Sequence, residues 1–451
     1  MLNSTENREI WMKYANESKD LLEVRATNAI EKHRKGYCKL RFVDENGNPL
    51  KGKSVKVNQC SHDFKYGANI FMLDEFESEQ DNKTYRENFK KYFNLATVPF
   101  YWDGLEPEEG KPRYAKDSEK VYRRPAPELC VEYCEENGIE PKLHCLVYDK
   151  FAPNWLPKRD MEKMERLYEE RFRQISERFS GRLYEVEVVN ELLCEAWWTT
   201  QTVISEKRDI VEWAFDLARK YFPNEVLVFN EGNPINVAAR YDYRSPYFMM
   251  LENALLKGVE IDKIGLQHHE FCGATAKTWE EYEKMVKNGS KLFDPKELYK
   301  GLDIFASLGL PLELTEVTIP TFGETEEDEE LQADLLEVLY TVCFGHEAVD
   351  GVVYWNVPDG YAYVSSEGNK GWNENACKGG LLHHDLTPKK SAERLYDLFN
   401  KKWHTELELT TDENGYVEFR GFYGDYTAEV EDAVAEFGIH KFEDNCTEVE
   451  I

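Results

Sequence analysis

Residues 161–231 contain one pattern twice: a charged helical segment, then a short β-forming segment that ends in polar residues. The helical segments are MEKMERLYEERFRQISERF (161–179) and SEKRDIVEWAFDLARKYF (205–222), and the β segments are YEVEVVNE (184–191) and VLVFNE (226–231). Helices that alternate with short apolar strands are typical of a parallel sheet whose strands are joined by helices. This stretch therefore favours an α/β fold.

The same alternation of helical and β-forming segments extends over residues 62–402 and gives eight candidate strands. The other six are FKYGANIF (64–71), FNLATVPF (93–100), KLHCLVY (142–148), KIGLQHHEF (263–271), LPLELTEVTI (310–319) and GVVYWNV (351–357). Eight strands that alternate with helices predict a closed (β/α)8 TIM barrel. The competing arrangement is an open doubly wound sheet, but no glycine-rich phosphate loop follows the first strand.

The two ends of the chain have a different pattern. A charged helix is expected over residues 8–35, and short alternating segments follow at 37–43 and 53–59. The tail has similar segments at 404–411, 417–422 and 425–431, joined by turn-rich sequence. We expect the ends to form one small accessory β module that packs on the barrel. The predicted division is 1–61 for the N-terminal helix and strands, 62–402 for the barrel, and 403–451 for the remaining strands.

The bulk composition excludes several classes of partner. A net charge of −30 repels a phosphate backbone, so no nucleic acid is expected. No run of 18 apolar residues occurs, so no membrane-spanning helix is expected. The polar start lacks an apolar signal core, which favours a cytoplasmic protein as given, or a secreted one if a signal was trimmed. The ten cysteines are scattered without metal-type spacing, so we expect free thiols and no metal. The sequence leaves the oligomeric state open.

Polar residues lie at the carboxyl ends of several candidate strands. In a barrel the carboxyl ends of all strands lie at one rim. Cleavage of a glycosidic bond needs two carboxyl groups, one protonated and one ionised. Glu191 and Glu316 are the predicted pair. Glu185, Glu187 and Glu195 compete with Glu191, whereas strand alternation is expected to place Glu313 on the opposite side from Glu316.

Several segments resemble glycoside hydrolase family 10, the endo-β-1,4-xylanases. VEVVNE (186–191) is similar to the acid/base motif W-D-V-V-N-E of that family, and LTEV (314–317) is similar to its nucleophile motif I-T-E-L-D. The third-strand motif resembles KLHCLVYDKFAPNWL (142–156), and the eighth-strand motif resembles YWNVPDGY (354–361). GLQHHEF (265–271) and FNEGN (229–233) resemble further motifs of the family, in the same order along the chain.

The resemblance implies a retaining β-glycosidase without a metal or organic cofactor. It acts by double displacement on β-1,4-linked xylan or xylo-oligosaccharides, with Glu191 as acid/base and Glu316 as nucleophile. The two carboxyl groups should then lie about 5–5.5 Å apart. The substrate-binding residues expected from the motifs and from the wall after the second strand are His144, Asn190, Gln267, His269, Trp355, Tyr101 and Asn230.

One departure affects substrate recognition. The family usually carries E-N-x-M-K-W after the second strand, but here FNLATVPFYWD (93–103) runs straight to Trp102 and places Tyr101 where the lysine stands. Pro99, Phe100 and Tyr101 are therefore expected to line that wall and to stack on the sugar. Trp197 and Trp198 are candidates for a further subsite or for packing on a helix. Two alternatives stay open: a non-catalytic carbohydrate-binding barrel, and a glycosidase for a different β-linked glycan.

Overall fold

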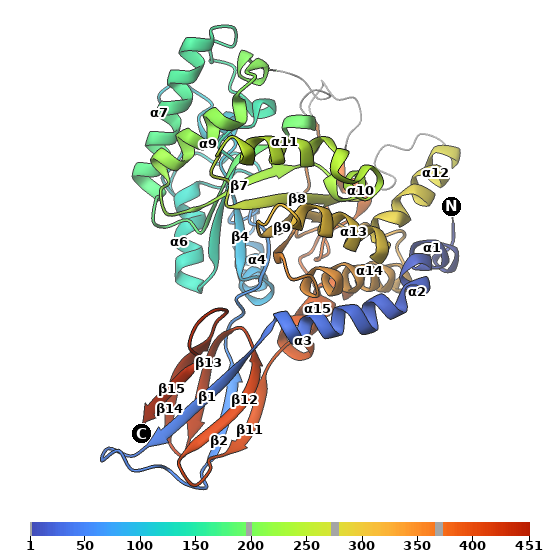
Figure 1. Cartoon of the computed structure of the whole chain (residues 1–451). Helices are drawn as coiled ribbons and strands as arrows, with labels where there is room; N and C mark the ends of the chain where they lie inside the picture. The colour runs from blue at the N-terminus through green and yellow to red at the C-terminus, as the bar shows by residue number, and fades with distance from the viewer. Residues whose placement is uncertain (1, 195–200, 272–278, 366–372) are drawn as a thin grey trace.

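The computed structural model describes residues 2–194, 201–271, 279–365 and 373–451, and it shows a barrel with a smaller β module below it (Figure 1). Eight parallel strands close into a barrel in the order β10-β3-β4-β5-β6-β7-β8-β9, which confirms the predicted fold class. The strands are β3 (Lys65–Asn69), β4 (Leu95–Pro99), β5 (Glu140–His144), β6 (Glu185–Asn190), β7 (Val226–Glu231), β8 (Lys263–His269), β9 (Leu312–Thr318) and β10 (Val349–Tyr354).

Helices connect these strands on the outside of the barrel. Asp160 caps the start of α7 by accepting from the Lys163 N–H, and Thr325 forms a capping box at the start of α14. The helices are α4 (Glu79–Tyr92), α5 (Trp102–Leu105), α6 (Pro127–Asn137), α7 (Met161–Phe179), α9 (Ile210–Tyr221), α10 (Pro234–Tyr241), α11 (Pro246–Leu256), α12 (Trp279–Gly289), α13 (Pro295–Ala306), α14 (Glu326–Phe344) and α15 (Lys390–Asp397). Within the described ranges, none of these helices combines the length and apolar character that a bilayer crossing requires.

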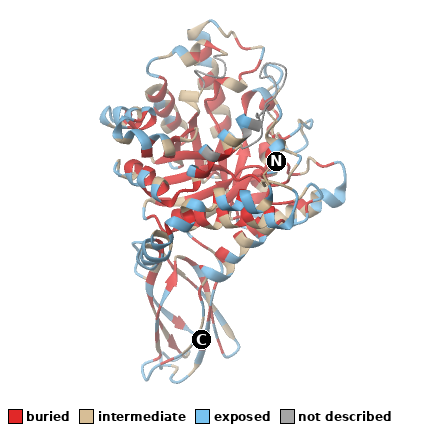
Figure 2. Ribbon diagram, turned by 90° about the vertical axis from the view of Figure 1, so that its right-hand side faces the viewer, coloured by how far each residue is buried: buried red, intermediate tan, exposed pale blue. Residues whose placement is uncertain are grey.

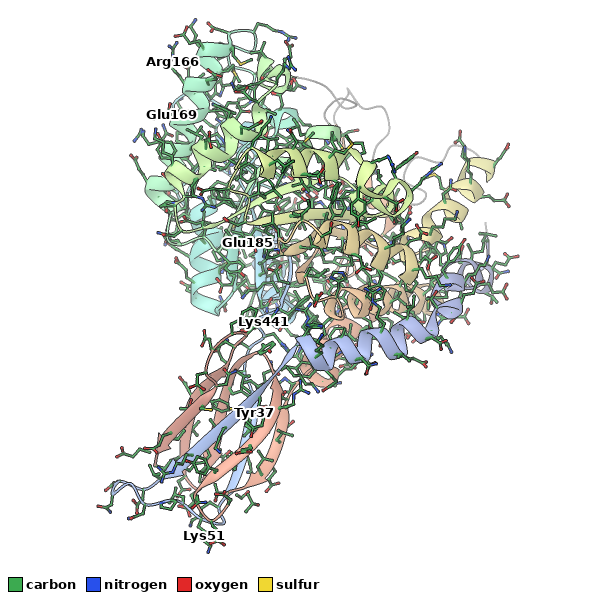
Figure 3. The ribbon with its side chains drawn as sticks, viewed as in Figure 1. Tyr37, Lys51, Arg166, Glu169, Glu185 and Lys441 are labelled. Atoms are coloured by element: carbon green, nitrogen blue, oxygen red, sulfur yellow. The ribbon has the colours of Figure 1, made fainter. Side chains whose placement is uncertain are left out.

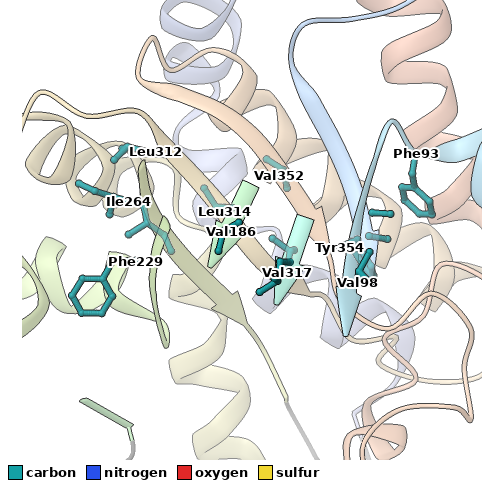
Figure 4. Close-up of a cluster of buried hydrophobic side chains, with 14 of the residues drawn as sticks. Phe93, Val98, Val186, Phe229, Ile264, Leu312, Leu314, Val317, Val352 and Tyr354 are labelled. Atoms are coloured by element: carbon teal, nitrogen blue, oxygen red, sulfur yellow. The ribbon is translucent and has the colours of Figure 1, made fainter. Parts of the chain in front are cut away.

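The strands are buried on both faces, as Figure 2 shows by the red centre of the barrel. Apolar side chains such as Val186, Leu314 and Val352 fill the space between the sheet and its neighbours (Figure 4). Burial of this kind is worth about 1.5–3 kcal/mol for each large apolar side chain. The barrel is thus a packed core that holds the strand ends in fixed positions.

Strand irregularities change which side chains face the barrel interior. The register of β9 against β8 and β10 shifts between Glu313 and Glu316, and the register of β6 against β7 shifts between Glu187 and Val189. The extra residue of such a bulge reverses the alternation of side chains. Glu313 therefore faces the interior, as Glu316 does, and the expectation that the two point to opposite sides is wrong.

The accessory module consists of two small sheets formed by both ends of the chain. One sheet has the order β12-β1-β15 and the other has the order β11-β2-β13-β14, around a core that includes Leu40, Val57 and Tyr426. The strands are β1 (Lys35–Val43), β2 (Ser54–Gln59), β11 (Glu406–Thr410), β12 (Tyr416–Phe422), β13 (Gly424–Val430), β14 (Ala433–Ile439) and β15 (Cys446–Glu450). In Figure 3, Tyr37 and Lys51 mark this module, and Lys441 lies where it meets the barrel.

The N-terminal helical segment, which the sequence grouped with the β module, packs on the barrel. It consists of α1 (Ser4–Trp11), α2 (Lys13–Glu17), a π-helical stretch at Leu21–Ala26 and α3 (Thr27–His33), and it runs beside α14 (Figure 1). Trp11 is fully buried, and its ring contacts Phe293 and Phe322. The large apolar surface of Trp11 ties this segment to the barrel core.

Candidate active site

A pocket of ≈ 240 Å³ opens at the carboxyl ends of the barrel strands. This volume is below the ~300–1,000 Å³ of sites for drug-sized ligands, so the enclosed part suits one reacting sugar rather than a long glycan segment. Eight of the nine predicted site residues line it, namely Tyr101, His144, Asn190, Glu191, Gln267, His269, Glu316 and Trp355. Asn230 lies beneath the pocket instead.

Glu191 and Glu316 are joined by one amide group. Gln267 Nε2 donates to Glu191 Oε1 at 3.0 Å and to Glu316 Oε1 at 2.8 Å. Because both oxygens contact the same nitrogen, they lie no more than about 6 Å apart, which is compatible with the separation of about 5–5.5 Å in retaining glycosidases. The two carboxyl groups therefore face each other across a gap that fits one anomeric carbon.

Glu316 is the deeper carboxyl group and is only 4% exposed. Asn230 Nδ2 donates to its Oε1 at 3.0 Å, and His269 Nε2 lies 3.2 Å from its Oε2. Burial raises the pKa of Glu316 well above its ordinary value, and the nearby Glu191 acts in the same direction, whereas the charge of His144 opposes them. Since two close carboxylates do not both ionise readily, the pair retains one proton over a wider pH range than either group alone.

Glu191 is half-buried and lies nearer the pocket mouth. The Tyr148 hydroxyl donates to its Oε2. Burial raises the pKa of Tyr148 well above its ordinary value, so this hydroxyl keeps its proton. The backbone of Glu191 is left-handed, with φ 54, and its N–H donates to the Asn230 carbonyl at 3.1 Å. Such a conformation costs roughly 1–2 kcal/mol in a non-glycine residue and commonly marks functional positions.

His269 and Asn230 hold the side chain of Glu316 from two directions. Burial lowers the pKa of His269 to about 4, so the ring is neutral at neutral pH. Its Nδ1 lies 2.8 Å from the Thr318 hydroxyl, so an accepting Nδ1 leaves Nε2 to donate to Glu316. Asn230 is fully buried and also donates to Asn190 Oδ1 at 2.8 Å. Asn230 therefore acts on the carboxylate and not on the sugar.

A chain of buried charges supports the pocket from below. The Lys142 Nζ lies 2.9 Å from Glu187 Oε1 and also pairs with Glu185 and Glu313, all of them shielded from solvent (Glu185 is labelled in Figure 3). Glu187 in turn pairs with His144 Nδ1, and His144 Nε2 lies 2.9 Å from the Tyr101 hydroxyl. These contacts link Lys142 at the barrel centre to Tyr101 on the pocket wall.

The Glu187 carboxylate favours the protonated form of His144. Burial alone would lower the pKa of His144, but the charge and the hydrogen bond of Glu187 raise it overall. A charged imidazole donates from both nitrogens, so Tyr101 accepts from Nε2 and its own hydroxyl hydrogen is available to a ligand. The positive charge of His144 also favours the ionised form of Glu316.

Replacement of Glu187 by glutamine is expected to destabilise the protein in a pH-dependent way. Burial would raise the pKa of Glu187, but Lys142 and His144 lower it from 4.5 to about 2. A depressed folded pKa gives stability above the unfolded value, and this stability is lost as pH falls. The difference in free energy of unfolding between wild type and Glu187→Gln should be largest above pH 4.5 and should shrink towards pH 2.

Urea denaturation over this pH range measures that difference, and the exposed Glu109→Gln variant is the control. A difference between wild type and Glu187→Gln that stays constant with pH would show that Lys142 and His144 do not hold the Glu187 carboxylate.

The ligand atoms of His144, Glu187 and Glu316 lie within 4.8 Å of one another, a spacing that a metal ion could bridge. Both ring nitrogens of His144 already have partners, in Glu187 and Tyr101. The donor set therefore fits a hydrogen-bonded charge chain better than a metal centre, in which a neutral histidine nitrogen must be free.

The structure adds residues that the sequence analysis did not select. Phe100 packs against Phe179 in the barrel core and Pro99 does not line the pocket, so of these three predicted wall residues only Tyr101 lies at the pocket. Glu195, Trp197 and Trp198 lie outside the described residues. The additional lining residues include Phe71, Arg123, Arg124, Tyr148, Phe151, Tyr363 and Glu374. Phe71, Tyr148 and Phe151 lie in or directly after quoted strand segments, and the tyrosine at 148 replaces a tryptophan of the resembling motif. Arg123, Arg124 and Glu374 lie outside those segments.

A paired-carboxylate site at the carboxyl end of a (β/α)8 barrel is the arrangement of barrel glycosidases. The family model for glycosyl hydrolase family 10 matches residues 59–392, and the chain belongs to this family. It is 24% identical over 406 residues to endo-1,4-beta-xylanase 2 of Arabidopsis thaliana, covering 88% of this chain and 32% of that protein. It is 25% identical over 363 residues to endo-1,4-beta-xylanase B of Thermotoga neapolitana, covering 78% and 92% of the two chains.

Solved structures share the fold. The crystal structure of xylanase 10B from Thermotoga petrophila RKU-1 in complex with xylobiose matches with a TM-score of 0.58 and 23% identity, covering 75% of this chain and 95% of that one. The chain spans less than half the length of the first three curated relatives it matches, with shares of 32%, 37% and 45%.

Proposed function

We propose that this chain is a retaining β-glycosidase that hydrolyses β-1,4-linked xylan or xylo-oligosaccharides by double displacement. The observation that carries the proposal is the Gln267 amide, which contacts both carboxyl groups and limits their separation. The family membership and the names of the relatives support the choice of xylan as substrate.

Glu316 is suited to act as the nucleophile. Its donors Asn230 and Gln267, together with His269, hold the carboxylate in one orientation. Burial raises the pKa of Glu316, but the charge of His144 and the Asn230 hydrogen bond oppose that rise and favour the ionised form that a nucleophile needs. In the first step a Glu316 oxygen attacks the anomeric carbon while the bond to the leaving oxygen breaks. The sugar is then bound to Glu316 as an ester, and the leaving oxygen takes a proton.

Glu191 is suited to supply that proton, because a general acid and base must exchange protons with the leaving group and then with water. Its half-buried position near the mouth allows both. In the second step Glu191 accepts a proton from water, and the hydroxyl attacks the anomeric carbon and displaces Glu316. Two inversions give net retention of the β configuration.

Three groups are placed to hold the reacting sugar. Trp355 is nearly buried, and its ring packs on Phe71 and His144, so it is a fixed apolar surface below the site. Asn190 uses its carbonyl oxygen to accept from Asn230 and Gln267, and among the described residues its amide nitrogen has no partner. That nitrogen is a donor for the sugar 2-hydroxyl, and the Tyr101 hydroxyl is a second donor.

Proton NMR during hydrolysis of xylotetraose is the test of the proposed function. We expect the new reducing ends to appear first as the β anomer and then to equilibrate with the α anomer. The Glu316→Gln variant, which keeps the size of the side chain, is the matched control and should release no product. An α anomer that appears first would contradict double displacement, and an absence of product from xylan and other β-linked glycans would favour a non-catalytic barrel.

A further inference from the structure

We propose that Arg123 and Arg124 form a carboxylate-binding subsite that selects glycans carrying a uronic acid beside the reacting sugar. The proposal rests on the proposed function, since it names the substrate class of the same pocket. Both arginines lie in the loop between α5 and α6, and both line the pocket. The carboxylate of a sugar acid is the ligand group they would take.

Arg124 presents its guanidinium to the pocket on an aromatic support. The group lies 4.0 Å from the centre of the Tyr101 ring and 5.4 Å from that of Phe151. Its one hydrogen bond within the described ranges runs from Nη1 to the Arg123 carbonyl at 2.9 Å. Tyr101 also contacts His144, so Tyr101 lies between the Arg124 guanidinium and the residues around the carboxylate pair.

Arg123 is the second member and is only 5% exposed. Its Nη1 donates to the Tyr361 carbonyl, and its Nη2 donates to Asn356 Oδ1 at 2.9 Å, which fixes the group in place. Its buried Nε has no hydrogen-bond partner in the described part of the chain. Its backbone is left-handed, with φ 60, a conformation that is costly for arginine and that the surroundings enforce.

Within the described ranges, the two cations lack an acidic partner in a strongly acidic molecule. The chain carries a net charge of −30, and some arginines, such as Arg86 with Asp74 and Arg394 with Asp334, pair with acids. Neither Arg123 nor Arg124 forms an ion pair with a described residue.

Buried arginines without an ion pair to a described residue, such as Arg113 and Arg171, each donate three hydrogen bonds to backbone carbonyls, whereas the Arg124 guanidinium donates one within the same part of the chain. Arg123 is buried and Arg124 is half-buried. A buried guanidinium group without a carboxylate is costly, and a ligand carboxylate would relieve that cost.

The other charges of the pocket do not neutralise the pair. Burial lowers the pKa of Arg123, and the charge of Glu374, which lines the pocket, offsets this only in part. Glu374 Oε2 accepts from Asn356 Nδ2 at 2.7 Å. Lys150 adds a further cation, 5.2 Å from the Tyr363 ring. Asp103 accepts from the Gly104 N–H at 2.6 Å and does not line the pocket. Burial raises the pKa of Asp103 and the charge of Arg124 offsets part of this rise, so the two groups interact without forming an ion pair.

The combination of groups selects a sugar acid rather than a simple anion. Aromatic rings accept the apolar face of a sugar, and a guanidinium group offers a planar pair of donors that matches a carboxylate. A uronic acid joins both features in one residue. A neutral glycan in the same position would cover the guanidinium groups without giving them an acceptor, and it would bind less well.

The test compares two xylo-oligosaccharides of equal length with one branch each. The branch is glucuronic acid in one of them and glucose, in which the carboxylate is reduced to a hydroxymethyl group, in the other. Wild type is expected to favour the acidic branch in kcat/KM by about tenfold or more, and rising salt should reduce this preference. Arg124→Gln should reduce the preference to about twofold or less, and Arg124→Lys should keep part of it as a point charge. Arg240→Gln, a change of an exposed arginine on α10, is the control and should keep the full preference.

Equal rates of wild type on the two branches would overturn the proposal, as would an equal loss on both branches in Arg124→Gln. Calorimetry with Glu316→Gln and the same two oligosaccharides separates the two proposals. Preferential binding of the acidic branch without turnover by wild type would remove the proposed hydrolysis and keep the arginine subsite. Turnover by wild type without any preference would remove the subsite and keep the hydrolysis.

Discussion

Glu316→Ala is expected to lower kcat on a nitrophenyl β-xylobioside by about 10⁴-fold or more, because the variant lacks the group that forms the glycosyl ester. Added azide should restore part of the turnover by occupying the space left by the carboxylate. Since azide then attacks from the face that Glu316 used, the product should be the α-glycosyl azide. Initial rates with and without azide, and NMR of the product, measure both effects.

The matched control for this variant is Glu316→Gln, which keeps the side-chain volume and should not be rescued. Thermal unfolding of both variants establishes that the barrel is intact. Activity of Glu316→Ala close to wild type, or a β-glycosyl azide as its product, would show that Glu316 is not the nucleophile.

Glu191→Ala is expected to show a loss that depends on the leaving group. A natural sugar leaving group needs a proton, so turnover of xylotetraose should fall by about 10²–10⁴-fold. A dinitrophenolate needs no proton, so the ester on Glu316 should form quickly with such a substrate and then persist. Azide should attack this ester and release the β-glycosyl azide, the opposite anomer from the Glu316 variant.

A burst of dinitrophenolate followed by a slow steady state is the kinetic sign of this behaviour. The Tyr148→Phe variant is a useful companion, because it removes the hydroxyl that donates to Glu191 and leaves the carboxyl group in place. An equal loss of Glu191→Ala on natural and activated substrates would contradict its role as acid/base.

The strand–helix alternation of the sequence predicted the barrel correctly. The periods of apolar residues in a helix and in a strand depend only on the spacing of neighbouring residues along the sequence. Polar residues at strand ends predicted six pocket residues for the same reason, since the closed barrel brings all carboxyl ends to one rim. The sequence did not reveal the bulge in β9, which places Glu313 on the same side of the strand as Glu316. A bulge shifts the alternation by one residue and leaves no mark in hydrophobic spacing.

Loop residues were the other group that the sequence could not place. Arg123 and Arg124 precede α6 in a segment without periodicity, and only the packed structure brings them over Phe71 and Tyr101. Asn230 was expected to touch the sugar because its strand ends at the rim, but its side chain is fully buried under Glu316. Depth along a strand is set by barrel stagger, which short motifs do not encode.

The central claim is that Glu316 attacks the anomeric carbon, with Glu191 opposite. Incubation with dinitrophenyl 2-deoxy-2-fluoro-β-xylobioside, which slows the second step more than the first, should leave the fluorosugar on the enzyme. Proteolysis and mass spectrometry should then find the added mass on the peptide that contains Glu316. A label on Glu191, on Glu187 or on any other residue would contradict the assignment, and so would active enzyme that hydrolyses xylotetraose without ever accumulating the adduct.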